Sequence, residues 1–322
     1  MRGEIVDRAR EIRRAEIALA PGVQQTTTAG TGSGFYGRQA SFSVNGSRPE
    51  GQVFLLDNVD VQGFWQRGIG SAVLGTTLGV EALAEFSTQT NTYSAQFGGN
   101  GAAINAVTKS GTNRVHGTLF EYLRNSALDS RTPFDGTKIP AFRQNQFGAS
   151  VGGPIKTDKA FFFANYEGVR KRQGLTRIAF VPDATARASV VPGPNAALIN
   201  TLLSYYPVAT TAGVNGIAQV PVVATQAGNE NYFLGRADYN LSSNDSVFVR
   251  YVIDHADFTD PFSGSNIPLW PETHRTKNTY TTAEERHVFG PSLINLFRGS
   301  FVRTKEGSNL NQNLPGLSFY PN

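Results

Sequence analysis

The sequence predicts a small glycine-rich α+β unit at the N-terminus, followed by part of an antiparallel transmembrane β-barrel. Three observations support this fold class. About seven candidate strands follow Asn113, and most are 9–12 residues long, close to the 9–11 residues that a tilted strand needs to cross a bilayer. Several of these strands alternate polar and apolar residues. The connections between them are long and short in strict alternation, which is typical of an outer-membrane barrel.

The composition favours a turn-rich β protein over a helical one. Of 322 residues, 34 are Gly, 22 are Phe and 11 are Tyr, whereas charged residues make up only 17%, below the usual quarter. The net charge is +4, but Lys and Arg are scattered, so nucleic-acid binding is not indicated. Cysteine is absent, which excludes disulfides, thiolate metal sites and a Cys nucleophile. No run of 18 apolar residues occurs, so no membrane helix is expected.

The first 112 residues read as the mixed unit. Residues 4–19 have the spacing of a short amphipathic helix, and Pro21-Gly22 ends it. A Gly- and Thr-rich loop is expected at 24–37. Strands are expected at 40–46, 51–59 and 102–111, and a short helix followed by a strand at 80–91. The N-terminus carries charges throughout and lacks the apolar run of a signal peptide, so any exporting segment is expected outside the given sequence.

The seven candidate strands have two different faces. They are residues 114–124, 144–152, 159–170, 230–240, 246–255, 276–289 and 293–304. In 246–255, Val247, Val249, Tyr251 and Ile253 share one face and Ser246 and Arg250 the other. In the strand before it, Arg236 and Asp238 lie opposite Phe233 and Tyr239. Because a barrel with lipid outside keeps its polar residues inside, Arg236, Asp238 and Arg250 are candidates to face the lumen; a solvated sheet face is the alternative.

The connections sort by length. Long ones are expected at 125–143, 171–229 and 256–275, and short ones at 153–158, 242–245 and 290–292. A barrel places all its short turns at one end and all its long loops at the other. A soluble sandwich has no reason to sort loops in this way.

No pattern predicts catalysis or a cofactor. The stretch "GSGFYG" at 32–37 has the glycine spacing of a dinucleotide loop but neither the strand nor the helix that such a loop needs. Asp57 and Asp60 could pair for acid–base work, yet no His or Lys lies nearby in the sequence. Asp254, Asp257 and Asp260 are weak candidates for a hard cation such as calcium; a solvated loop is the simpler interpretation. We therefore expect no enzyme activity, no catalytic residues and no cofactor.

Three stretches carry a family resemblance. They are "FSVNGSRPEGQVFLLDNVD" (42–60), "EFSTQTNTYSAQFGGNGAAINAVTKSGTNRVHGTLFEYLRNSALDSR" (85–131) and "FRQNQFGASVGGPIKTDKAFFFANYEGVRKRQG" (142–174). These stretches resemble TonB-dependent outer-membrane receptors, in particular the Oar-like group. The resemblance is strongest over residues 20–174 and continues to the end.

The resemblance implies a plug domain at 1–112, incomplete at its N-terminus, and the N-terminal part of a β-barrel at 113–322. It implies the Gram-negative outer membrane, with the plug on the periplasmic side of the lumen. The implied partners are a TonB-type energy-transducing protein, outer-membrane lipid and an extracellular solute of unknown identity. A plugged barrel of this class has 22 strands, so the chain is expected to be a fragment of a transporter. The alternative is a surface β protein that binds carbohydrate or peptide, or acts as an adhesin, without transport.

Overall fold

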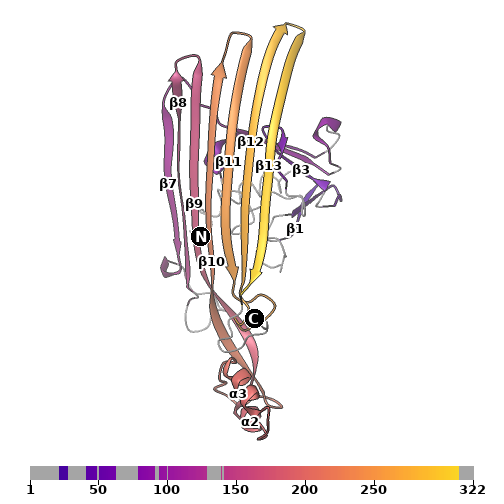
Figure 1. Ribbon diagram of the computed structural model, residues 1–322, viewed down its shortest axis with the longest axis vertical. Coiled ribbons are helices and arrows are strands. Elements are labelled where there is room, and N and C mark those ends of the chain that lie inside the picture. The colour runs from indigo at the N-terminus through magenta and orange to yellow at the C-terminus, as the bar shows by residue number, and fades with distance from the viewer. Residues whose placement is uncertain are drawn as a thin grey trace.

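The computed structural model describes residues 22–27, 41–48, 51–62, 79–90, 94–99, 101–128, 139 and 141–311. These residues form three sheets, of two, four and seven strands. The seven-stranded sheet is a tall wall of long strands, and the two smaller sheets lie beside it (Figure 1). We call the smaller sheets together the N-terminal unit and the large sheet the wall.

The N-terminal unit is built from short strands and single turns of 3-10 helix. Strands β1 (Val23–Thr27) and β2 (Ser41–Val44) pair with each other. The four-stranded sheet has the order β4-β3-β6-β5, with bounds Val53–Leu56 (β3), Val59–Asp60 (β4), Leu83–Gln89 (β5) and Ala103–Thr108 (β6). Two 3-10 turns, η2 (Val80–Ala82) and η3 (Ala95–Phe97), complete it. Phe54 and Ile104 form its own small core.

Most of the expected elements of this unit are present. The strands expected at 40–46 and 102–111 correspond to β2 and β6, and η2 with β5 matches the helix and strand expected at 80–91. Two expectations were wrong. The single strand expected at 51–59 is the hairpin β3–β4, because the chain turns at 57–58, and residues 23–27 form β1 and not the start of a loop. Pairing with β2 stabilises the strand although the local preference of "VQQTT" for strand is weak. The helix expected at 4–19 lies outside the described residues.

The wall contains all seven strands that the sequence predicts, joined as an antiparallel meander from β7 to β13. Their bounds are His116–Asn125 (β7), Phe142–Lys156 (β8), Ala160–Pro182 (β9), Ile217–Asn240 (β10), Asp245–Asp260 (β11), Glu272–Gly290 (β12) and Leu293–Leu310 (β13). In this part of the chain β7 and β13 are the two edges of the sheet.

Strands β9 and β10 are 23 and 24 residues long, about twice the length expected. Their outer halves continue as a two-stranded ribbon beyond the other strands (Figure 1). Pro221 lies in this ribbon, opposite Ile178. A strand that pairs on one side only can accommodate a residue without an N–H. The prolines and alanines that suggested a very long loop therefore belong partly to a strand.

The connections are sorted between the two ends of the wall, as the alternation predicted. Short turns at 157–159, 241–244 and 291–292 lie at one end. The strand ends at which β7 leads to β8, β9 to β10 and β11 to β12, through the longer connections, lie at the other (Figure 1). The longer ones carry η4 (Ser126–Leu128), α2 (Ala184–Ala188) and α3 (Ala196–Ser204). Within the described residues, neither α-helix is long and apolar enough to span a membrane.

The two faces of the wall have different surroundings. One face packs on the N-terminal unit, where Val61 and Ala82 join a core with Phe163, Leu234 and Val252. We call this the inward face. On the outward face of β11, Val249 and Tyr251 keep 46% and 40% of their surface exposed, whereas their neighbours Arg250 and Val252 on the inward face are buried. At this level of β11, a charge is thus buried on the inward face and apolar surface is exposed on the outward face.

Candidate functional site

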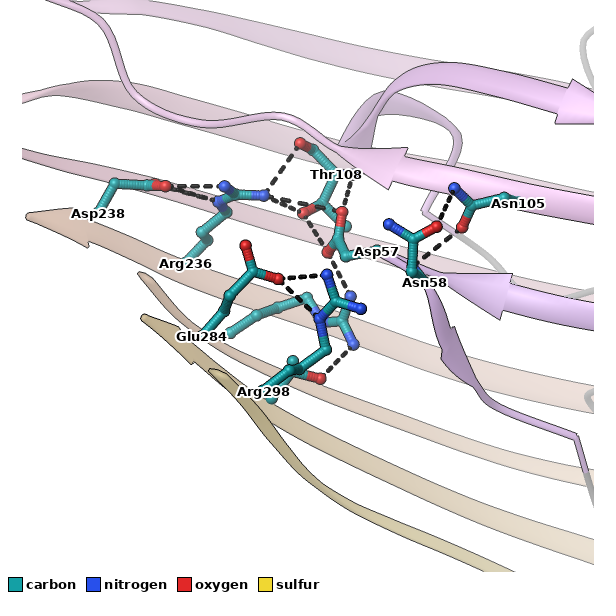
Figure 2. A network of polar contacts seen from close by, with 10 residues as sticks. Asp57, Asn58, Asn105, Thr108, Arg236, Asp238, Glu284 and Arg298 are labelled. Atoms are coloured by element: carbon teal, nitrogen blue, oxygen red, sulfur yellow. Dashed lines mark hydrogen bonds and ion pairs between the residues drawn. The ribbon is translucent and has the colours of Figure 1, made fainter. Parts of the chain in front are cut away.

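The site lies where a hairpin of the N-terminal unit meets the inward face of the wall. Asp57 and Asn58 form the two-residue turn between β3 and β4, with φ of 48° and 60°. A tight hairpin turn of this kind needs two left-handed residues, and Asp and Asn tolerate that conformation. The Asn105 amide donates to the Asn58 side chain over 3.1 Å, and the Asn58 N–H donates back over 3.0 Å (Figure 2). The turn is therefore held firmly, with the Asp57 carboxylate at its tip.

The Asp57 carboxylate is buried and fully engaged. Thr108, at the end of β6, donates its N–H to Oδ1 and its hydroxyl to Oδ2, both over 2.8 Å. From the wall, the Arg250 guanidinium forms an ion pair with Oδ2. Arg236 Nη1 lies 3.8 Å from Oδ1. One carboxylate of the N-terminal unit is thus shared by two arginines from neighbouring strands, β10 and β11. Figure 2 shows Asp57 between Thr108 and Arg236.

Each arginine is held by further contacts on the wall. Arg236 donates to the Asp238 carboxylate, with Nη2 2.7 Å from Oδ1, and to the Thr108 hydroxyl over 2.8 Å. Its guanidinium also lies over the Phe248 ring, 4.3 Å from the ring centroid. Arg250 has no exposed surface and donates to the Thr282 hydroxyl of β12 over 2.7 Å. Nearby on the wall, Arg298 donates to Glu284 (Figure 2).

The charges of this cluster balance, which is what allows their burial. Arg236 and Arg250 are matched by Asp57 and Asp238. A buried charge is costly unless it is paired and hydrogen-bonded, and removing one partner of a buried pair costs much more than the pair contributes. The cluster contains no activated nucleophile that could attack an acyl or phosphoryl group. Its arrangement can instead fix how the N-terminal unit sits on the wall.

A second contact surrounds Gly79 and η2. Glu167 on β9 is buried, and its Oε1 accepts the Glu81 N–H over 3.1 Å. Gly79 has a φ of 96°, and a Cβ there would lie 2.6 Å from the Tyr232 ring. Only glycine fits both the backbone and the space. The N-terminal unit therefore contacts the wall through η2 and Gly79 as well as through the Asp57 hairpin.

The structure brings the three lumen-facing candidates together. Arg236, Asp238 and Arg250 all lie on the inward face, and the first two are bonded to each other. Sequence reasoning did not foresee their contact with Asp57 and Thr108. The sequence places Asp57 within an expected strand and suggests only a possible acid–base pair with Asp60. Asp60, the other half, instead accepts the Gln62 N–H over 2.9 Å.

The three cation candidates are not brought together. All lie within β11, since the strand runs to Asp260 and the expected outer loop begins later. Asp254 is buried on the inward face, whereas Asp257 is exposed on the outward face and accepts the Asn229 amide over 2.9 Å. In the described part of the chain, Asp245, Glu285 and His287 do have ligand atoms within 4.8 Å of one another. Two of them, Asp245 and His287, already pair.

Comparison with known proteins identifies the family. A family model described as an outer membrane β-barrel domain matches residues 107–320. The TonB-dependent transporter Oar of Myxococcus xanthus is 32% identical over 156 residues, which are 46% of this chain and 13% of that protein. The chain thus corresponds to a small part of that relative's length.

The outer membrane transporter YddB from Escherichia coli shares the fold; it is 14% identical, with a TM-score of 0.51 over 84% of this chain and 34% of that one. The ferric preacinetobactin receptor BauA from Acinetobacter baumannii is 10% identical, with a TM-score of 0.47 over 92% and 45%. By the match of the family model, the chain belongs to the outer membrane β-barrel family, and it resembles TonB-dependent transporters of the Oar kind.

Proposed function

We propose that the N-terminal unit is the plug, and the wall the first part of the barrel, of an energy-coupled outer-membrane transporter. In this proposal the outward face meets lipid, and the short turns face the periplasm. The long connections, including the ribbon and helices of 174–225, face outside and meet a solute. The observation that carries the proposal is the buried shared carboxylate of Asp57, because it holds the N-terminal unit against the inward face through paired charges.

The energetic role of the cluster follows from its composition. Apolar contacts such as those of Ala82 resist separation in any direction, but they lose little if the unit slides. A charged hydrogen bond has a defined geometry and is lost within a short displacement. Pulling on the plug would therefore have to separate Asp57 from Arg250 and Arg236 at an early stage. The pulling force would come from a TonB-type protein of the inner membrane.

The solute is not needed to test this proposal. The chain has no cysteine, so Ala82→Cys introduces a unique thiol at a position that is fully buried against the wall. Cells carrying this variant are treated with a membrane-impermeant maleimide after the outer membrane has been made permeable to it. We expect labelling in energised cells, and strong reduction by a protonophore or by deletion of the TonB-type gene.

A matched control separates movement from unfolding. Ile104→Cys places the thiol in the internal core of the N-terminal unit, beside Phe54. If the plug moves as a body, the thiol of Ile104→Cys stays protected while the thiol of Ala82→Cys becomes labelled. Labelling of Ala82→Cys that does not respond to energy would contradict transport and favour the alternative, a surface binding protein whose N-terminal unit is a fixed support.

A further inference from the structure

The outward face changes character at one level of the wall. On β13, Phe301 is followed on the same face by Arg303 and Lys305, and on β11 Ile253 is followed by His255. On β9, Tyr166 and Gly168 are followed by Arg170 and Arg172. These positions are aligned by pairing, since Gly168, Asn231, His255, Lys277 and Lys305 form one continuous row across five strands. The apolar band therefore ends at a basic belt on the side of the long connections.

Part of this belt borders an open hollow of about 500 Å³, and most of the residues that line it belong to the outward face. Its basic lining residues are His255, Arg275, Lys277 and Lys305, which we call the basic cluster. Asn231 adds an amide. Two carboxylates also line it. Of these, Asp257 is bonded to Asn229, and Glu306 belongs by register to the inward side of β13. On the outward face the cluster therefore has an excess of positive charge.

The cations of the cluster are free to bind an anion. In the described part of the chain, no ion pair or hydrogen bond engages the side chains of Arg275, Lys277 or Lys305. The neighbouring basic residues differ. Arg170 donates to the Asn231 side chain over 2.7 Å, and Arg172 donates to that of Asn229 over 3.0 Å. The belt thus contains arginines fixed by the protein next to three cations that form no ion pair in the described part of the chain. Asp257 lies opposite Arg275 in the register, so three positive charges face one negative charge at this place.

We propose that the basic cluster binds the phosphate of a phosphorylated lipid in the outer leaflet. Arg and Lys are the residues that hold phosphate oxygens, and clustered cations at a membrane surface recognise anionic headgroups. Its position selects a lipid over a soluble anion. The exposed rings of Tyr251 and Phe301 lie on the same face just below it, where acyl chains attached to a bound headgroup would pack. The proposal rests on the membrane placement given above, and not on transport.

The test measures lipid binding by the detergent-extracted protein. The probe is a bisphosphorylated lipid A, compared with the same lipid after enzymatic removal of its phosphates, and with inorganic phosphate alone. The variant R275Q/K277Q/K305Q removes three charges. The control K156Q/K159Q/R286Q removes two lysines and one arginine from exposed positions near the short turns. Heat-modifiable migration on gels checks that each variant has folded.

We expect the native protein and the control to bind phosphorylated lipid A equally and to prefer it over the dephosphorylated form. Removal of three charges should weaken binding roughly a hundredfold, since each basic residue near a charged membrane surface contributes about fivefold. Equal binding by the cluster variant, no preference for phosphate, or equally strong binding of inorganic phosphate would each overturn the proposal. These results are independent of plug movement, so failure here leaves the transport proposal to its own test.

Discussion

The inward and outward faces of the same seven strands place charged and apolar side chains in opposite surroundings. On β11, Arg250 has no exposed surface, whereas the adjacent Val249 is 46% exposed. The inward face therefore buries charge, and each arginine of the cluster needs a carboxylate partner: Asp57 of the N-terminal unit for Arg250, and both Asp57 and Asp238 for Arg236. The outward face exposes apolar surface and needs none. A strand pattern alone can therefore identify which residues share a face. The role of a buried charge depends on what is packed against it.

The largest effect is expected from breaking the buried pair. Arg250→Met leaves the Asp57 carboxylate without its closest cation, and loss of one partner of a buried ion pair costs about 3–5 kcal/mol. We expect the N-terminal unit to separate from the wall at lower denaturant concentration, followed by protease sensitivity of 51–108. The double variant R250M/D57N should recover part of that loss, because the uncompensated charge is gone. Equal stability of the single variant and the native protein would contradict an anchoring role.

A charge introduced on the outward face should destabilise the protein for a different reason, namely contact with lipid. Val249→Arg places a charge in the middle of the apolar band, which costs about 2–4 kcal/mol when the site faces the bilayer midplane. Leu293→Arg, on the same face but at the rim beside a short turn, should cost about 0–1 kcal/mol. Folding into lipid vesicles measured against urea checks this pair. Similar costs at both positions would show that the two do not differ in membrane depth.

A smaller loss of stability should show whether the hydroxyl of Thr108 or its shape contributes to the cluster. Thr108→Val removes the donor to Asp57 and the acceptor for Arg236, and leaving buried polar groups without a partner costs about 1–3 kcal/mol. Thr108→Ser keeps the hydroxyl and should retain most of the stability. The same denaturation measured for Arg250→Met checks both variants. If Thr108→Val kept the native stability and Thr108→Ser lost it, the methyl group and not the hydrogen bonds would matter.

The sequence was sufficient for the wall and insufficient for the site. The alternation of polar and apolar residues and the alternation of long and short connections depend only on local spacing. All seven strands and the opposite faces of Arg250 and Val249 could therefore be predicted. The length of β9 and β10 could not, because Pro221 is disfavoured in strands except at an unpaired edge. The Asp57–Arg250 contact joins residues 193 positions apart. No local pattern encodes such a contact, and the three Asp residues of β11 looked like a loop because their strand continues to Asp260.

The smallest effect concerns the long connection after β9. The pKa of Asp183 lies below its usual range because the Ala186 N–H and then the Gly213 N–H donate to its carboxylate. A lowered pKa in the folded state means that this stabilisation is complete above the unfolded-state value of about 3.9 and is lost as pH falls through the folded-state value. We expect amide NMR signals of Ala186 and Gly213 to shift together in that acidic range. In Asp183→Asn the shift should be absent, whereas a shift that persisted would assign it to another group.

The difference between the two faces is itself open to direct measurement. Because the chain has no cysteine, a nitroxide can be attached singly at each position from Val247 to Ile253 in lipid vesicles. We expect collisions with oxygen, which dissolves in lipid, to be frequent at Val247, Val249, Tyr251 and Ile253 and rare at the three positions between them. A water-soluble nickel complex should not reach the four outward positions. Free access of nickel to those four, or no alternation at all, would contradict the claim that this wall meets lipid on one side and the N-terminal unit on the other.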